Sequence, residues 1–262
     1  MRKSLLEPLT FVENLKRLGL ISRAVFAVYL GKYLELPVLS FGTWDLQRYS
    51  TSPDFTYLQA DISAGLWAFT VANAAFGNIT LQSASSPAAI DSSEKKLVVP
   101  KAVYDPIRKA ICDNVECFGD NHSVGFTCSN LANSLRPNLT FTLNSLPVTI
   151  SPDFYLGIRI RKKSLDKCIL QLDWREAQET WLLGFPLMRS NYLLFDVETG
   201  VVGVAAARQE DDIPQWVFWL LALGVLVVLG TLVLMLLFCL GYENCKICGG
   251  QQAAATEESL LH

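Results

Sequence analysis

Residues 87–100 read PAAIDSSEKKLVVP, and this stretch decides the fold. Two short apolar runs, residues 87–90 and 97–100, flank a polar segment that begins with Asp91. Apolar runs of this length, bounded by turn-forming residues, indicate buried β-strands. The stretch therefore predicts a buried strand, a tight turn and a second buried strand, with the Asp91 carboxylate held at the tip of the first strand.

The rest of the chain predicts a mainly β domain. At 262 residues it is long enough for one sizeable domain or two small ones. Short alternating runs separated by turn signals favour strands over helices. Strands are expected at residues 24–30, 36–41, 66–71, 78–82, 138–143, 148–150, 181–184, 192–197 and 201–205. An amphipathic helix is expected near the N-terminus, with Phe11, Leu15, Leu18 and Leu20 on its apolar face, and a short helix at residues 104–112.

Composition removes several classes of function. The net charge of −3 argues against a nucleic acid partner. The two histidines, His122 and His262, leave little material for Ser-His or Cys-His catalysis or for a histidine-based zinc site. We therefore expect no metal and no cofactor, and any catalysis must come from carboxylates.

A single apolar segment near the C-terminus predicts a transmembrane helix. Residues 216–240 carry no charge, and Thr231 is their only polar side chain. A run of this length exceeds the roughly 20 residues that a helix needs to cross a bilayer. A buried core helix is the alternative, although runs this long are rare in soluble cores. We expect a linker at residues 208–215, the span at 216–241 and a short tail at 242–262.

Three sequons and four cysteines precede this segment and favour a luminal or extracellular location for that side, with a short cytoplasmic tail. The sequons begin at Asn78, Asn121 and Asn138. The cysteines are Cys112, Cys117, Cys128 and Cys168, and we expect Cys112 and Cys117 to close a small disulfide loop. The N-terminus has a basic start but lacks the apolar core of a signal peptide. A tail-anchored protein with a cytosolic domain and an incomplete chain therefore both stay open.

Several segments in this order resemble the C-terminal lobe of pepsin-like aspartic peptidases. They are residues 41–45 (FGTWD), 65–71 (GLWAFTV), 89–93 (AIDSS), 137–150 and 181–204. The resemblance implies a single mainly β lobe at residues 36–207, preceded by an interlobe helix and strand at 1–35. It also implies that Asp91 stands at the position of the second catalytic aspartate, beside residues 182–184, and that Cys128 pairs with Cys168; in this chain we expect Asp91 to be a remnant of the catalytic motif.

The sequence departs from the family around Asp91. Ser92 keeps the hydroxyl position beside the aspartate and Gly184 keeps the glycine of the neighbouring strand, but Ser93 replaces the motif glycine, and Glu94, Lys95 and Lys96 follow. If φ at Ser93 were positive, its Cβ would cost about 1–3 kcal/mol. The two lysines are expected to reach solvent or to pair with Asp91 and Glu94.

These departures lead to a prediction about activity. Peptide hydrolysis by this route needs two carboxylates that share one proton, and the family's first aspartate motif and flap have no counterpart in this sequence. The resemblance implies a membrane-anchored aspartic endopeptidase that acts on peptide or protein substrates. We expect little or no hydrolysis by the chain alone, unless a separate N-terminal lobe or a second copy supplies the other aspartate. The alternative is a non-catalytic peptide- or protein-binding module.

Overall fold

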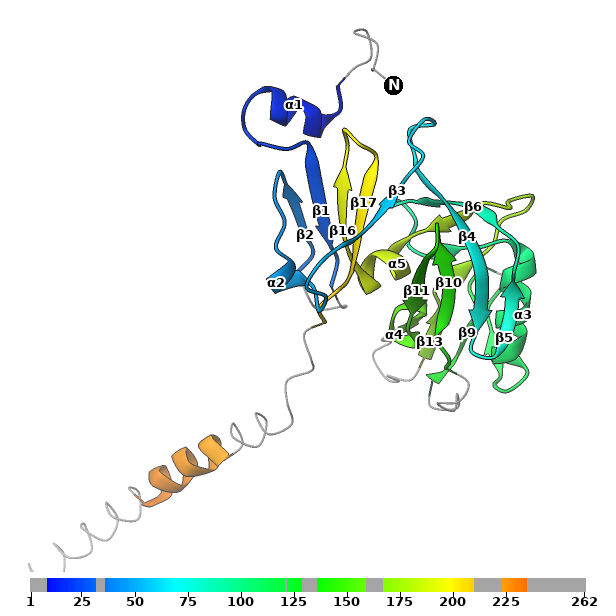
Figure 1. Ribbon diagram of the computed structural model, residues 1–262. Coiled ribbons are helices and arrows are strands. Elements are labelled where there is room, and N and C mark those ends of the chain that lie inside the picture. Colours follow the sequence, from blue (N-terminus) through cyan, green and yellow to red (C-terminus); the bar gives the residue numbers. More distant parts are fainter. Residues whose placement is uncertain are drawn as a thin grey trace, which may run out of the picture. The chain divides into compact units, whose positions relative to one another are not determined.

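The computed structural model describes residues 9–31, 36–120, 122–128, 136–158, 167–209 and 223–234. The chain divides into two compact units, Met1–Glu210 and Asp211–His262. The first unit is mainly β, as the sequence predicts, and its strands form three sheets (Figure 1).

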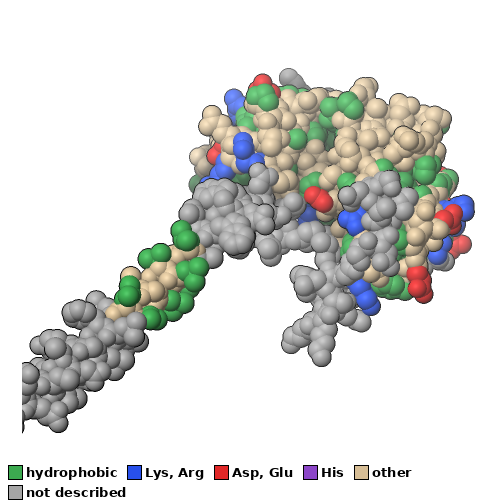
Figure 2. Space-filling model, turned by 90° about the horizontal axis from the view of Figure 1, so that it is seen from below, with side chains coloured by type: hydrophobic (Ala, Val, Ile, Leu, Met, Phe, Trp, Pro, Cys, Tyr) green, Lys and Arg blue, Asp and Glu red, His purple; other side chains and the backbone are tan. Residues whose placement is uncertain are grey.

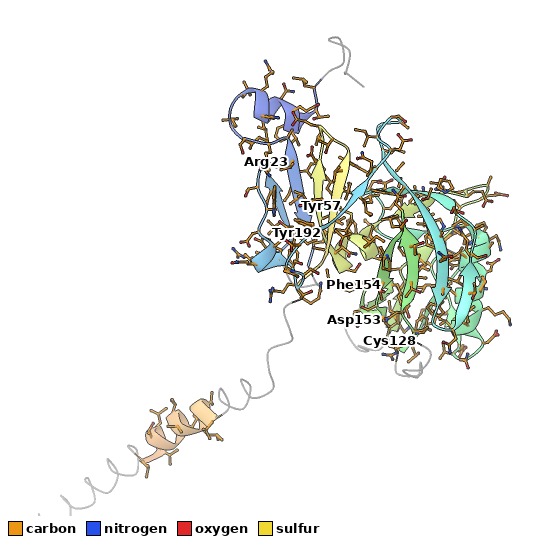
Figure 3. All side chains as sticks on the ribbon, viewed as in Figure 1. Arg23, Tyr57, Cys128, Asp153, Phe154 and Tyr192 are labelled. Carbon is orange, nitrogen blue, oxygen red and sulfur yellow. A yellow bond between two sulfur atoms is a disulfide. The ribbon has the colours of Figure 1, made fainter. Side chains whose placement is uncertain are left out.

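A five-stranded antiparallel sheet joins strands from the early and late parts of the first unit. Its order is β2-β1-β16-β17-β3, so β2 and β3 are its edges. The strands are β1 (Val25–Tyr29), β2 (Val38–Phe41), β3 (Thr56–Gln59), β16 (Asn191–Asp196) and β17 (Val201–Ala206). Side chains of β1 alternate between the two faces, and Val25, Ala27 and Tyr29 are buried in a small cluster with Tyr192 (Figure 3).

An eight-stranded sheet forms the larger part of the unit and holds the segment that contains Asp91. The strands are β4 (Trp67–Phe76), β5 (Ile79–Gln82), β6 (Ser86–Ile90), β7 (Leu97–Val98), β10 (Leu139–Leu143), β11 (Leu146–Ile150), β14 (Leu172–Asp173) and β15 (Trp181–Leu183). The order is β11-β10-β4-β6-β15-β7-β14, and β5 pairs with β4 outside this path. Although β15 comes late in the chain, it lies between β6 and β7, parallel to the first and antiparallel to the second.

A small four-stranded sheet is held by disulfides. Its order is β12-β13-β9-β8, and its strands are β8 (Cys117–Phe118), β9 (Gly125–Thr127), β12 (Leu156–Ile158) and β13 (Lys167–Leu170). Cys128, at the end of β9, is bonded to Cys168 in β13 (Figure 3). A second disulfide joins Cys112 to Cys117. The structure thus contains both expected pairings.

The helices of the first unit are short. They are α1 (Phe11–Arg17), α2 (Leu46–Tyr49), α3 (Lys101–Cys112), α4 (Pro152–Tyr155) and α5 (Phe185–Ser190). A capping box between Thr10 and Glu13 starts α1. A helix forms at the expected place, but the assignment of its apolar face is wrong. Phe11 is 64% exposed, Leu18 and Leu20 lie beyond the end of α1 and are 63% and 68% exposed, and Val12 is the residue of the helix that is buried.

The predicted start of the second helix is also wrong, because α3 begins at Lys101 and not at residue 104. Pro100 occupies the N-cap position, and its backbone is not helical, so the helix begins at the next residue. Val103, Tyr104, Ile107 and Ile111 form the buried face, which is the i, i+3, i+4 pattern of an amphipathic helix. Pro106 lies inside the helix.

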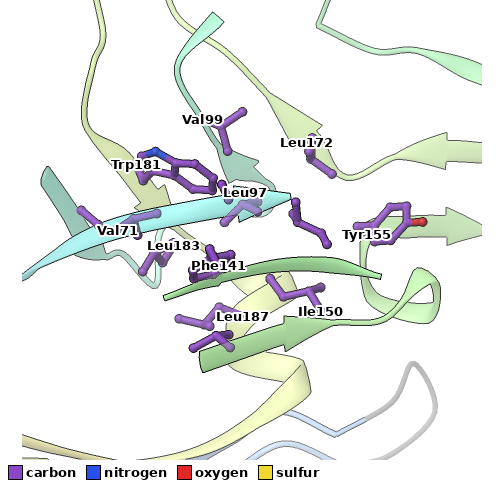
Figure 4. Close-up of a cluster of buried hydrophobic side chains, with 14 of the residues drawn as sticks. Val71, Leu97, Val99, Phe141, Ile150, Tyr155, Leu172, Trp181, Leu183 and Leu187 are labelled. Atoms are coloured by element: carbon purple, nitrogen blue, oxygen red, sulfur yellow. The ribbon is translucent and has the colours of Figure 1, made fainter. Parts of the chain in front are cut away.

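The main core lies against the eight-stranded sheet. Trp181 and Leu183 of β15, Phe141 of β10 and Leu97 of β7 are at most 2% exposed and pack into one cluster (Figure 4). The indole of Trp181 lies 5.4 Å from the ring of Phe141, measured between centroids. The strands that flank Asp91 are therefore anchored in the best-buried part of the protein.

In the second unit, residues 223–234 are helical, and their apolar side chains are exposed along the helix (Figure 2). Among the residues that the structure describes, no helix is both long and apolar enough to span a membrane. The remainder of the predicted span, residues 216–222 and 235–241, lies outside the described residues.

Candidate active site

Asp91 lies directly after β6, where three strands meet. β15 pairs with β6 through Leu183 and Ile90, so Asp91 follows β6 at the carboxyl end of both parallel strands. The Asp91 backbone N–H donates to the carbonyl oxygen of Leu183 at 3.3 Å. The sheet thus holds the aspartate next to the 182–184 strand, as the resemblance implied.

The Asp91 carboxylate forms a local turn with Ser93. Its Oδ1 accepts hydrogen bonds from the Ser93 backbone N–H at 2.9 Å and from the Ser93 hydroxyl at 2.7 Å. Asp91 is half-buried, whereas Ser92 and Ser93 are exposed. In the described part of the chain, Ser93 is the side chain that bonds to this carboxylate. Ser93 does not have a positive φ, so the strain considered for this position does not arise.

Gly184 packs directly beneath the loop that follows Asp91. A Cβ at this position would lie 2.3 Å from the carbonyl oxygens of both Glu94 and Lys96. The next residue, Phe185, donates its backbone N–H to the Glu94 carbonyl at 3.0 Å. The φ angle of Gly184 is −84°, which other residues also adopt. Position 184 therefore requires glycine because of this close approach and not because of its backbone conformation.

The charged residues that follow Asp91 do not pair with its carboxylate in the structure. Glu94, whose side chain is 17% exposed, forms an ion pair with Arg175, with 2.6 Å between the carboxylate Oε1 and the guanidinium Nη2. Lys96 lies 3.7 Å from the Asp173 carboxylate and also donates to the His122 carbonyl. Lys95 is exposed and reaches solvent, which was one of the two expectations for the lysines. The pairing of Lys96 with Asp173 was not predicted. Arg175 and Asp173 gave no sequence signal because their proximity to the loop depends on the parallel pairing of β14 with β7.

An apolar pocket of about 500 Å³ opens beside Asp91. Ile90 and Ser92, the two neighbours of Asp91, line it. Phe26, Trp67 and Phe195 form an aromatic wall, with ring centroids of Phe26 and Phe195 4.7 Å apart in a stacked arrangement. Val38 and Leu39 of the edge strand β2 form part of the rim, and Leu39 is 56% exposed. The volume lies within the range of pockets that bind small ligands or side chains.

The family model for eukaryotic aspartyl proteases matches residues 2–207, which is most of the chain. The chain belongs to the eukaryotic aspartyl protease family. A single pepsin-like lobe is consistent with this match and with the arrangement of the sheets.

Curated relatives agree with this assignment. The chain is 32% identical over 200 residues to Rhizopuspepsin-1 of Rhizopus niveus, covering 75% of this chain and 47% of that protein. It is 26% identical over 201 residues to Pepsin II-1 of Oryctolagus cuniculus, covering 74% and 49%, and 23% identical over 196 residues to Chymosin of Bos taurus, covering 74% and 48%. The chain spans about half the length of these aspartyl proteases.

The other predicted site residues fall in different places. Asn78 and Asn138 are exposed, and Asn121 lies outside the described residues. The catalytic role of Asp91 and the attachment of glycans stay predictions.

Proposed function

We propose that this chain is the Asp91-bearing lobe of a membrane-anchored aspartic endopeptidase, and that the chain alone binds peptides but hydrolyses them little or not at all. The observation that carries the proposal is the set of contacts around the Asp91 carboxylate. Its carboxylate is bonded to Ser93, while Glu94 is engaged by Arg175. A proton-sharing pair needs a second carboxylate close to the first, and neither contact supplies one.

The missing carboxylate would come from a separate lobe. The relatives are about twice as long as the matched part of this chain, which leaves room for a second lobe of similar size. The apolar pocket beside Asp91 and the exposed Leu39 at its rim offer a surface for such a partner or for a peptide. We place this unit on the luminal or extracellular side of a membrane, with residues 216–241 as the anchor and a short cytoplasmic tail. The disulfides support an oxidising compartment.

A direct test uses the full chain in detergent micelles and a library of fluorescence-quenched peptides at acid pH. We expect no cleavage above the background of the Asp91→Asn variant. Cleavage that Asp91→Asn abolishes, by a chain shown to be monomeric in sedimentation, would show that the lobe is active alone, and the single-carboxylate argument would be wrong. The same cleavage by a dimer would mean that a second copy supplies the other aspartate, and the proposal that the chain alone is inactive would be wrong.

The alternative function is a non-catalytic peptide- or protein-binding module, which the intact apolar pocket favours. Binding of a statine-type inhibitor or of apolar fluorescent peptides can be measured by anisotropy. Leu39→Glu places a charge at the rim of the pocket and should weaken binding at least tenfold. The matched control is Leu66→Glu, because Leu66 is 53% exposed and does not line the pocket. Equal binding by both variants would exclude the pocket as the binding surface.

A further inference from the structure

Two sequons that are far apart in the sequence lie side by side in the fold. Asn78 is an exposed residue in the two-residue turn between β4 and β5, and Asn138 is exposed one residue before β10. The Gly77 N–H donates to the Asn138 carbonyl oxygen at 3.1 Å, and Leu139 pairs with Phe76. The two asparagines therefore occupy one end of the eight-stranded sheet.

This end of the sheet is remote from Asp91. β4 begins at Trp67, which pairs with Ile90 beside Asp91, and it ends at Phe76 beside Asn78. A strand of ten residues spans roughly 30 Å. Large groups attached at Asn78 and Asn138 would leave the pocket and the Asp91 loop open.

The same end also has a surface that benefits from cover. Among the described strands, β5 pairs with β4 only, and its first residue, Ile79, is 41% exposed. An edge strand with an exposed apolar side chain is a site for unwanted pairing with other chains. A bulky polar group on Asn78 would stand directly beside this edge.

We infer that Asn78 and Asn138 both carry N-linked oligosaccharides, which together cover the β4–β5 end of the sheet and leave the Asp91 face free. The amide nitrogen of each asparagine forms a bond to the C1 carbon of a sugar carried on a lipid pyrophosphate. The bond from C1 to the pyrophosphate oxygen breaks, the amide loses one proton, and the lipid pyrophosphate leaves. Thr80 and Thr140 provide the hydroxyl residues that the acceptor sequence requires.

The test expresses the full chain in a eukaryotic cell, in an Asn121→Gln background, with an added N-terminal peptide that carries a reference sequon. Treatment with an N-glycan-releasing enzyme should remove glycans from the tag and from two further positions. Asn78→Gln and Asn138→Gln should each remove one glycan. Thr80→Ala and Thr140→Ala should do the same, whereas the matched controls Thr80→Ser and Thr140→Ser should keep both.

The reference sequon separates this inference from the luminal placement on which it rests. If the tag is glycosylated and Asn78 or Asn138 is bare, the inference is wrong and the placement stands. If the tag and both asparagines are bare, both are wrong. In addition, the Asn78→Gln variant should self-associate more than wild type in light scattering, while its peptide binding stays within twofold. A loss of peptide binding would contradict the separation of this end from the Asp91 face.

Discussion

Replacing Gly184 by alanine should destabilise the loop that follows Asp91. The new Cβ would lie 2.3 Å from the carbonyl oxygens of Glu94 and Lys96, whereas contacts of less than 3.0 Å are essentially never seen. Each carbonyl must therefore retreat by at least about 0.7 Å. Because both oxygens are backbone atoms of the loop that follows Asp91, the loop cannot relieve the clash by a simple rotamer change.

The magnitude follows from two contributions. Inserting one carbon into a packed region costs about 1–3 kcal/mol. Displacing the Glu94 carbonyl also weakens its hydrogen bond with the Phe185 N–H, which adds about 0.5–1.5 kcal/mol. We expect Gly184→Ala to lower the free energy of unfolding by about 2–4 kcal/mol.

The assay is urea unfolding of the full chain in micelles, followed by tryptophan fluorescence, since the buried Trp181 lies on β15, the strand that ends just before Gly184. Gly224→Ala is the matched control, because a Cβ there would meet nothing within 4 Å. A loss below about 0.5 kcal/mol for Gly184→Ala would refute the reasoning, and a crystal structure should show the loop displaced.

Three further predictions concern pH, charge and covalent links. Burial raises the pKa of Tyr104 to about 12. The stability contributed by the neutral Tyr104 phenol is therefore complete below about pH 10, the ordinary Tyr pKa, and is lost between about pH 10 and 12. Tyr104→Phe should flatten this alkaline loss in a pH series of thermal unfolding. Arg175→Gln should lower stability by less than about 1 kcal/mol in urea unfolding, since Arg175 is half-exposed where it meets Glu94, and a larger loss would mean that the ion pair organises the loop. Replacing Cys128 and Cys168 together by serine should cost roughly 4 kcal/mol on the chain-entropy model, and an unchanged melting temperature would show that the 40-residue link is unimportant.

The sequence was most informative where chemistry is local. The apolar runs on both sides of Asp91 predicted a strand, a turn and a strand, and the structure has β6, an exposed loop and β7 at those positions. The strand at 181–184 was also found, because its apolar residues lie together in the chain. The resemblance then placed it beside Asp91, which periodicity alone does not do.

The sequence failed where a residue's surroundings depend on distant pairing. Leu18 follows the periodicity of the predicted apolar face, yet it is exposed, because α1 ends at Arg17 and Val12 is the residue of the helix that is buried. Arg175 was overlooked because no local pattern says that it reaches Glu94 across the sheet. The aromatic wall of the pocket joins Phe26, Trp67 and Phe195, which come from three separated segments and two sheets.

The late position of β15 in the chain has a consequence for how the protein is made. β6 and β7 cannot close around their central neighbour until residues 181–183 have been synthesised, so the Asp91 loop lacks this support while the segment between β7 and β15 is being made. Pairings between segments this far apart in sequence form slowly, because the intervening chain must first lose much of its freedom. A nascent chain released before β15 is made would keep Asp91 and both apolar runs but lack the strand that joins them. Its sheet would have exposed strand edges, which chaperones and quality-control proteases can bind.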